Sequence, residues 1–462
     1  VEHERLIYPL TVVPLAMVEP PERGRWLGPL YRDPVLWAGF AIPAVWSTLH
    51  GLYAYWPELF VLFQNQDMLH LRVPLFRGTT ELYFFFRFNI LGFFYFVKTE
   101  IAFSLWFFNL LAHALRGAFG ILGVSSSERI LQSAIPDAIM ARHSIGAMVV
   151  LFGGGAWAAR RHLRAVLRKA LTGDPAIDDT DEILSYRAAV ILMMAGTAVV
   201  GGWLWMVGMH PGMILGLLLL SAALLVGFAR IVAESGLSDA SLPVIPAGAL
   251  AATVGAPALG PGGLIALTTT YVWSAGIRSF VMTSAANSLK LAEHLGPRRR
   301  PLFWIMVAAL TVAFLSAVGM ALELSHTHGA LNLHTWSKAS AFDDMARLVQ
   351  SPGAGDLWGW AHLGLGAAVM AALMVVRWHF LWWPLHPLGY PIGPIWIMDH
   401  LWFNMFLAWA IKVAVLRYGG VRLYRRTRPF FCGLILGQIV PGGAFLIVDH
   451  FTGMAGNIIF WG

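Results

Sequence analysis

The sequence predicts an all-α membrane protein that crosses the bilayer many times. Of its 462 residues, 58% are hydrophobic and 12% are charged, whereas a typical soluble domain carries about 25% charged residues. The 47 glycines, 20 tryptophans and 29 phenylalanines are typical of membrane helices, because small residues let helices approach closely and aromatic residues favour the interface. Since each span needs about 20 apolar residues, we expect about 10–12 transmembrane helices, with at least one broken or re-entrant segment.

The charge and the cysteine content narrow the possible functions. The single cysteine, Cys432, excludes internal disulfides and cysteine-based metal clusters. The net charge is +7, but many basic residues lie in short loops beside apolar runs, where they set topology and contact anionic lipid. We therefore predict the lipid bilayer as a partner and no nucleic-acid binding. Residues 1–5 are polar and form no signal peptide, so we expect a processed chain or one that begins inside a longer protein.

The first half of the chain is expected to form a lead-in and a first helical bundle. Residues 1–33 hold several prolines among charges, which predicts an interfacial lead-in. Residues 34–235 contain the apolar runs of the first bundle region. Within it, residues 57–80 are mixed in character and are expected along the interface or as a re-entrant piece. The apolar stretch 82–124 is interrupted at Lys98 and Glu100, and we expect two helices there.

Residues 236–263 are predicted to form the broken or re-entrant segment. They are rich in Gly, Pro and Ala, which is too irregular for a continuous helix and too apolar for an exposed loop. Irregular backbone at membrane depth must be buried in protein or line a wet cavity. Membrane helices are expected again at 264–324 and 359–462, separated by a polar interfacial segment at 325–358.

Three basic clusters, at 160–169, 298–300 and 417–428, are expected on the cytoplasmic side. Simple crossings do not bring all three to one side. An extra crossing near 240–262 and another irregularity between 325 and 394 are required. Interruptions of this kind are common in transporters, where broken helices form the binding site.

Thr283, Asn287 and Lys290 are candidates for the wall of a translocation path. They follow one another at steps of four and three, which places them on one side of a helix. A polar stripe that faces lipid is costly, so this side should face the protein interior or a wet cavity. The alternative is a helix that approaches the interface, where Lys290 extends to water.

Two further polar residues lie in or beside apolar runs. Glu234 ends such a run next to the Gly/Pro-rich segment and is a candidate for binding a proton, a cation or a substrate ammonium. Pairing with Arg230, four residues earlier, is the structural alternative. Asn404 lies deep in the predicted penultimate span and is a candidate for the ion or substrate path, or for a hydrogen bond to another helix.

Metal, cofactor and enzyme functions are not predicted. His326 and His328 follow Glu323 and are weak candidates for a transition-metal site. Their spacing fits no standard zinc pattern, and a polar helix exit explains them. The sequence contains no phosphate loop, dinucleotide fingerprint or nucleophile elbow. We therefore predict no catalytic residue, no bound metal and no cofactor.

Several short motifs together resemble the oligopeptide transporter (OPT) superfamily, in particular an uncharacterised bacterial branch. The resemblance implies a multi-pass protein of the bacterial inner membrane whose opening motif follows several earlier spans. The chain would then correspond to the later two-thirds of the usual architecture, with an N-terminal part missing or carried on another chain. It assigns no binding residue. The motifs are 1–10 (VEHERLIYPL), 103–108 (FSLWFF), 158–164 (AARRHLR), 232–237 (VAESGL), 386–390 (HPLGY), 416–420 (LRYGG) and 429–437.

Two functions follow as hypotheses. The first is a secondary transporter that moves a small peptide-like or chelate-like solute with proton coupling. The second is a scaffold or accessory subunit that reuses a transporter-like fold to dock other membrane subunits. The broken segment and Glu234 favour the first, whereas the missing start, the polar segment 325–358 and the many interfacial tryptophans favour the second.

Overall fold

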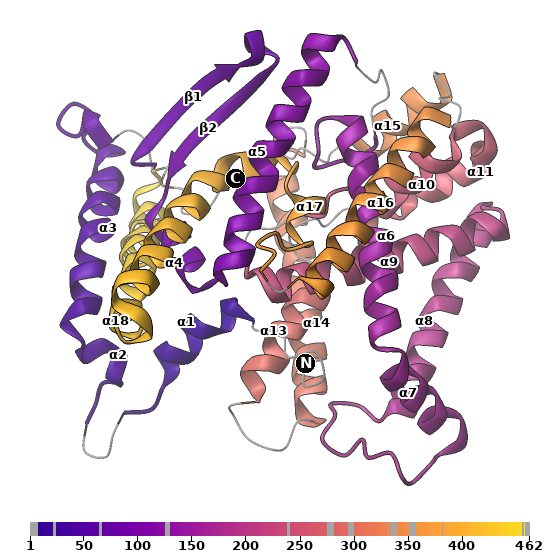
Figure 1. Ribbon diagram of the computed structural model, residues 1–462, viewed down its shortest axis with the longest axis horizontal. Coiled ribbons are helices and arrows are strands. Elements are labelled where there is room, and N and C mark those ends of the chain that lie inside the picture. The colour runs from indigo at the N-terminus through magenta and orange to yellow at the C-terminus, as the bar shows by residue number, and fades with distance from the viewer. Residues whose placement is uncertain are drawn as a thin grey trace.

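The protein is a bundle of apolar helices in the computed structural model (Figure 1). Eight helices of the described part are long and apolar enough to cross a membrane, which confirms an all-α polytopic membrane protein. The described residues are 8–21, 25–63, 67–124, 130–237, 241–274, 281–293, 300–330, 332–333, 340–350, 357–380, 382–454 and 457.

The eight long helices include the first bundle and the C-terminal helices. Their number is below the predicted 10–12, mainly because one of them, α18, contains two predicted spans. The long helices are α3 (Pro34–Tyr53), α5 (Thr99–Leu122), α6 (Ala138–Ala158), α8 (Tyr186–Val207), α9 (Pro211–Ser235), α14 (Arg300–His328), α16 (Leu357–His379) and α18 (Trp396–Thr452).

Shorter elements connect these helices. They are α1 (Pro9–Val18), α2 (Pro29–Arg32), α4 (Phe88–Phe96), α7 (Arg160–Thr172), α10 (Pro246–Val254), α11 (Ala256–Thr269), α12 (Tyr271–Ser274), α13 (Val281–Ala292), α15 (Ser340–Gln350), α17 (Gly389–Ile392), the strands β1 (Leu69–Leu75) and β2 (Thr80–Phe86), and the 3₁₀ turns η1 (Val61–Phe63) and η2 (Phe76–Gly78).

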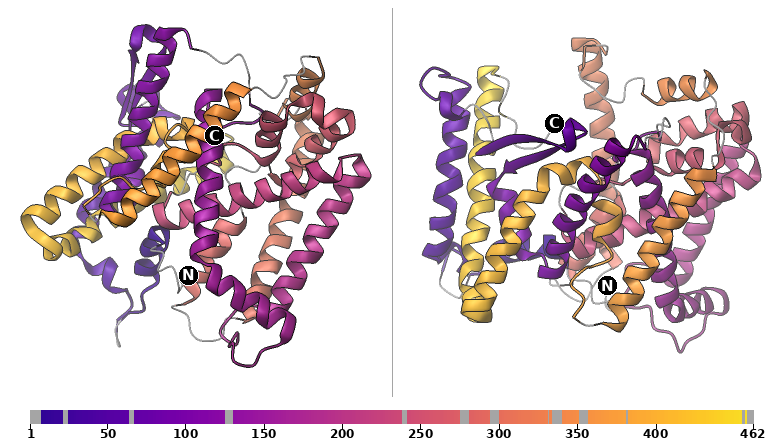
Figure 2. Two further views of the ribbon diagram at one scale, coloured as in Figure 1. Left: turned by 45° about the vertical axis from the view of Figure 1, so that its right-hand side comes forward. Right: turned by 45° about the horizontal axis from the view of Figure 1, so that its top comes forward.

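The helix α18 has 57 residues, or about 85 Å at 1.5 Å per residue, which is far longer than one crossing needs. It bends at Gly420, whose φ of 61° and ψ of −164° are accessible mainly to glycine. The bend separates a first arm that packs on α5 from a second arm that packs along α3 (Figure 2). The predicted basic loop at 417–428 is therefore the corner of a bent helix.

The region 57–80, expected along the interface or as a re-entrant piece, contains β1, the first strand of an antiparallel hairpin with β2. Leu69 pairs with Phe86 and Leu75 with Thr80. In β1 the sequence Leu-His-Leu-Arg-Val alternates apolar and polar residues, the period of a half-exposed strand. The stretch 82–124 thus begins as a strand and continues as α4 and α5, which are separated at the expected break near Lys98.

The predicted broken segment is broken at glycines. Gly255 (φ 84°) separates α10 from α11, and Gly260 (φ 65°) interrupts α11. Most of α10 is buried, so its irregular backbone is covered by protein, as a membrane location requires. The helical path also changes at Thr269, so 264–289 is not one continuous span among the described residues.

A second irregular stretch, 382–395, lies almost wholly within the region 325–394, where an irregularity was expected. It links α16 to α18 and contains the one-turn helix α17. Residues 391–395 are buried, and Gly393 N–H donates to the Gly389 carbonyl at 2.8 Å. This non-helical linker inside the bundle presents backbone and side-chain polar groups to the neighbouring helices.

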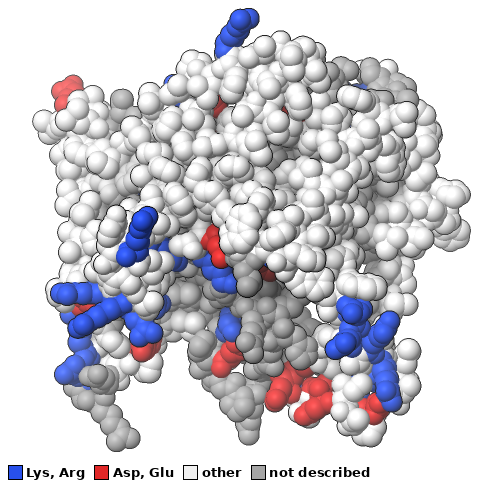
Figure 3. Space-filling view, in the orientation of Figure 1, with Lys and Arg blue, Asp and Glu red and all other residues white. Residues whose placement is uncertain are grey.

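Charged side chains gather toward one edge of the molecule. On the face that Figure 3 shows, Lys and Arg lie mainly in the lower half, over the corner of α18 on the left and α7 on the right, whereas most of the upper half is uncharged. Two of the three predicted basic clusters therefore share an edge, with the β1–β2 hairpin at the opposite edge (Figure 1).

Candidate functional site

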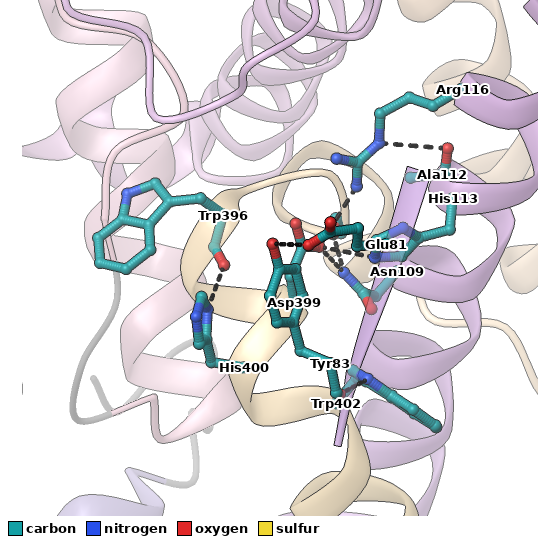
Figure 4. Close-up of polar contacts among 11 residues, drawn as sticks. Glu81, Tyr83, Asn109, Ala112, His113, Arg116, Trp396, Asp399, His400 and Trp402 are labelled. Carbon is teal, nitrogen blue, oxygen red and sulfur yellow. Dashed lines mark hydrogen bonds and ion pairs between the residues drawn. The ribbon is translucent and has the colours of Figure 1, made fainter. Parts of the chain in front are cut away.

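A cluster of four polar side chains, which we call the Asp399 centre, lies between α5 and the first arm of α18 (Figure 4). Asn109, His113 and Arg116 follow one another on α5 at steps of four and three, so they share one side of that helix. Their contacts converge on one oxygen of Asp399. Asn109 Nδ2 donates to Oδ1 at 2.7 Å, Arg116 Nη2 donates to it at 3.3 Å, and His113 Nε2 lies 3.0 Å away.

The Asp399 centre is almost completely withdrawn from solvent. Asp399 is 5% exposed, His113 is 3% exposed and Asn109 is fully buried. A buried carboxylate is tolerated only when it is paired and hydrogen-bonded, and Arg116 supplies the compensating charge. Both ring nitrogens of His113 are buried, and neither makes a hydrogen bond among the described residues, although Nε2 lies close to the Asp399 carboxylate.

Aromatic rings of the hairpin cover the start of α18. The ring of His400 lies nearly parallel to the rings of Tyr83 and Phe85, with centroids at 5.0 and 4.8 Å, and those two rings stack on each other. Trp402 Nε1 donates to the Tyr83 carbonyl at 2.7 Å. These contacts fix strand β2 against the first turns of α18 and shield Asp399 from the side of the hairpin (Figure 4).

A second polar group lies at the crossing of α6 and α16. His143 Nε2 and His362 Nδ1 are 3.1 Å apart, and Tyr390 Oη from α17 lies 3.5 Å from His143 Nδ1. The two helices approach closely because Gly146 and Gly366 lie at the crossing, where an added Cβ would be 2.0 and 2.2 Å from backbone oxygens of the opposite helix. The small residues thus bring the two imidazoles into contact.

The linker with α17 connects the two polar groups. Tyr390 contacts His143, and the Gly393 carbonyl accepts a hydrogen bond of 2.9 Å from Asn109. A cavity of about 20 Å³ is bordered by α5, α6 and α17, with His143, Tyr390 and Ala112 in its wall. This volume suits about one water molecule. Any larger solute requires the helices to move apart.

Glu234 lies at the end of α9 and is paired. Its Oε1 accepts from Arg230 Nε at 3.1 Å, and its Oε2 lies 3.7 Å from His386 Nε2. Pairing with Arg230 is the structural alternative that the sequence offered for Glu234. The structure adds His386, a partner from the α16–α18 linker that sequence spacing does not indicate.

Asn404 is fully buried and both ends of its amide are used. Its Oδ1 accepts from the Arg87 backbone N–H at 3.0 Å, and its Nδ2 donates to the Phe85 carbonyl at 2.9 Å. Asn404 therefore fastens α18 to the end of β2, one turn beyond Asp399.

Thr283, Asn287 and Lys290 share a half-buried side of α13, apart from the Asp399 centre. Asn287 Nδ2 donates to the Thr283 carbonyl at 2.9 Å, and Lys290 Nζ pairs with Glu293 at 2.5 Å. These two side-chain contacts are local to one helix, although α13 itself packs against α9, the helix that carries Glu234 near its end.

His326 and His328 lie on the exposed last turn of α14. Among the described residues, no three His, Cys, Asp or Glu side chains converge as metal ligands require.

Sequence reasoning missed the Asp399 centre, although part of its pattern was visible. Asn109, His113 and Arg116 repeat at helical spacing within an apolar run, the same pattern that drew attention to Thr283 and Asn287. Their partner Asp399 is 283 residues away from Arg116 along the chain, and no local pattern predicts such a contact.

Comparisons with known proteins leave the activity open. A model described as a family of unknown function matches residues 1–461. No curated protein matches the chain, and no solved structure matches it.

Proposed function

The chain belongs to the DUF6785 family, whose function is unknown, and from the Asp399 centre we propose that it is a secondary transporter coupled to protons. The solute class that we infer is a small peptide-like or chelate-like molecule, in line with the resemblance to the oligopeptide transporter superfamily. An enzyme function has no comparable support from the geometry.

The observation that carries this proposal is a buried carboxylate between two basic side chains inside a bundle of membrane helices. Charged residues inside a membrane are costly and usually mark substrate or ion pathways. Arg116 balances the charge of Asp399, and His113 lies against the same carboxylate oxygen. We propose that protons pass through this cluster and that a change in its contacts alters how α5 holds α18.

The arrangement around the cavity supports a closed state of such a transporter. The two polar groups are connected through α17, and the small cavity beside His143 and Tyr390 suits about one water molecule. Discontinuous helices at the centre of a bundle form the binding sites of many transporters. We propose that movement of the 382–395 linker opens this space to solute.

The proposed membrane is the bacterial inner membrane. The corner of α18 and α7 share one basic edge (Figure 3), and short loops rich in Lys and Arg remain on the cytoplasmic side. This edge is therefore assigned to the cytoplasm.

The test uses purified protein in proteoliposomes that contain the pH dye pyranine. The probe is a pool of di- to pentapeptides together with a ferric hydroxamate chelate. Addition of the pool should acidify the lumen, and Asp399→Asn should slow this at least about tenfold, because Arg116 then lacks its counter-charge. Glu323→Gln, an exposed carboxylate at the end of α14, is the control and should behave as wild type.

Two results bear against the proposal. Acidification that Asp399→Asn and His113→Gln leave unchanged removes the Asp399 centre from coupling. If Glu234→Gln alone abolishes acidification, proton coupling belongs to the pair of Glu234 and Arg230 instead. Size-exclusion profiles of each variant show whether a loss reflects misfolding.

The surface of α14 favours the second function, an accessory subunit of a larger membrane complex. None of the side chains that the structure describes on this 29-residue helix is buried, and an apolar helix that exposes most of its side chains is free to pack against another membrane helix. Mild extraction and native electrophoresis test this. A lone monomer that is active in the proteoliposome assay excludes an obligate partner.

A further inference from the structure

The amphipathic helix α7 lies at the end of two membrane helices. A single residue, Ala159, separates it from α6, and it packs against α8. His162 contacts the ring of Tyr186 at the start of α8, with centroids 6.0 Å apart. One side of α7 is thus held by the bundle, and the other sides are open.

A stripe of leucines on the open side is uncovered. Leu163, Leu167 and Leu171 follow at steps of four, which places them in one row. They are 45, 48 and 81% exposed. Three aligned leucines need an apolar environment, and the described residues do not supply one.

A row of arginines runs beside the leucines. Arg160, Arg164 and Arg168 have the same spacing, and Arg164 and Arg168 each directly follow a leucine of the row. Arg168 pairs with Asp174 at 2.9 Å, whereas Arg161 and Arg164 are exposed and have no ion-pair partner among the described residues. Two guanidinium groups therefore remain available for external anions.

Trp157 marks the level at which these rows meet the bilayer. It is 70% exposed at the end of α6, and the Arg160 guanidinium lies 4.6 Å from its ring. Tryptophans at the ends of membrane helices favour the headgroup level. The leucine row therefore begins where acyl chains meet headgroups.

We propose that α7 lies in the headgroup layer and binds anionic phospholipids. The leucines enter the outermost part of the acyl chains, and Arg161 and Arg164 bind lipid phosphates. This pattern of an apolar row beside a basic row is that of helices that lie in the interface. An acidic soluble protein would match the arginines but leave the leucine row without an apolar partner. The inference holds whether or not the protein transports a solute.

The acidic loop after α7 limits how much of the helix contacts lipid headgroups. Asp174, Asp178, Asp179 and Asp181 follow the helix closely, and an anionic leaflet repels them. The Asp174 carboxylate also pairs with Arg168, and the Asp174 backbone carbonyl accepts a hydrogen bond from Lys169 Nζ at 2.9 Å. Headgroup contact is therefore concentrated on the first two turns of α7.

A fluorescent label on α7 tests the proposal in the full-length protein. Cys432→Ser removes the native thiol, and Leu167→Cys carries the environment-sensitive dye NBD. The protein is placed in nanodiscs of phosphatidylcholine with or without phosphatidylglycerol. With the anionic lipid, iodide quenching of the label should fall at least about twofold, because the dye is drawn to the headgroup layer. Arg161→Gln with Arg164→Gln should abolish this difference.

The control is the same label at Leu315→Cys on α14, which should respond neither to the anionic lipid nor to the arginine changes. Quenching at Leu167→Cys that is equal in the two lipids, whether high or low, overturns the proposal. So does protection that requires an added soluble protein. As a second measure, the wild type should retain more phosphatidylglycerol through purification than the double arginine variant, and equal retention also contradicts the proposal.

Discussion

His386 lies where three helix ends meet, between the paired carboxylate of Glu234 and the start of α5. Its backbone N–H donates to Ser104 Oγ at 2.6 Å, and its Nε2 lies 3.7 Å from Glu234. Burial lowers the pKa of His386 from 6.5 to about 3, and the positive charges of Arg377, Lys98 and Arg230 act in the same direction. Glu234 opposes this, but burial and three cations prevail, so the folded protein holds the imidazole neutral.

This residue should make stability depend on pH. Because the folded pKa lies below the unfolded value, the unfolded chain binds more protons between about pH 3 and 6.5, and folding is favoured as pH rises. Stability is fully present above pH 6.5 and falls by up to about 1.4 kcal/mol per pH unit below it. Thermal unfolding of the detergent-solubilised protein should show this loss.

His386→Gln should flatten the pH profile, since glutamine does not titrate. The control is His379→Gln on the exposed last turn of α16, which should keep the wild-type slope. Identical slopes for wild type and His386→Gln would remove the buried imidazole as the cause.

At the scale of single residues, the sequence located polar groups but not their partners. It predicted that Glu234 either binds a ligand or pairs with Arg230, and the structure shows the pair. It weighed a hydrogen bond for Asn404, which the structure extends to β2. Asp399 could not be predicted as a site residue, because its three partners lie on α5, almost 300 residues earlier.

At the scale of elements, the crossing of α6 and α16 depends on two glycines. In Gly366→Ala the added Cβ would lie 2.2 Å from the His143 carbonyl oxygen, so the helices must separate. We expect a loss of about 1–3 kcal/mol, typical of overpacking, and a longer distance between His143 and His362. Chemical denaturation measures the first effect, and the exchange rate of the imidazole protons by NMR measures the second.

Gly364→Ala is the matched control, because an added Cβ there meets nothing within 4 Å. It lies on the same helix, two residues from Gly366, and should stabilise slightly or have no effect. Equal losses for both variants would show that helix propensity, rather than the crossing, decides the outcome.

The hairpin was missed by local patterns, and the second break was expected only as an irregularity somewhere between 325 and 394. Residues 80–86 are almost entirely apolar and aromatic, and such a run reads equally as a buried helix or a strand. The linker 382–395 carries Pro and Gly like any surface loop, and only packing against α5 and α6 makes it an interior element. The Gly/Pro-rich 236–263 segment was easier to predict, since it is apolar apart from a few residues and holds only one charged side chain.

At the scale of the whole molecule, the composition predicted the membrane class but not the path of the chain. The predicted spans near both ends of α18 exist, but as arms of one helix. The count of crossings therefore depends on a single backbone conformation at Gly420.

The shared basic edge makes a prediction about topology. In a Cys432→Ser background, Asp181→Cys after α7 and Arg426→Cys in the corner of α18 should react with a membrane-impermeant maleimide from the same side, the cytoplasm. Arg77→Cys in the exposed turn of the hairpin should react from the opposite side. Labelling of intact cells and of inverted vesicles distinguishes the sides, and opposite labelling of Asp181→Cys and Arg426→Cys would contradict the assignment.

The bend of α18 also determines how far Asp399 moves when the first arm tilts. Asp399 lies 21 residues before Gly420, so the first arm is a lever about 30 Å long. A tilt of about 5° at the corner shifts the carboxylate by nearly 3 Å, since displacement equals length times angle. That shift is as long as the hydrogen bond between Asn109 and Asp399. A small rotation at one surface of the membrane therefore suffices to make or break the charged contact in the interior.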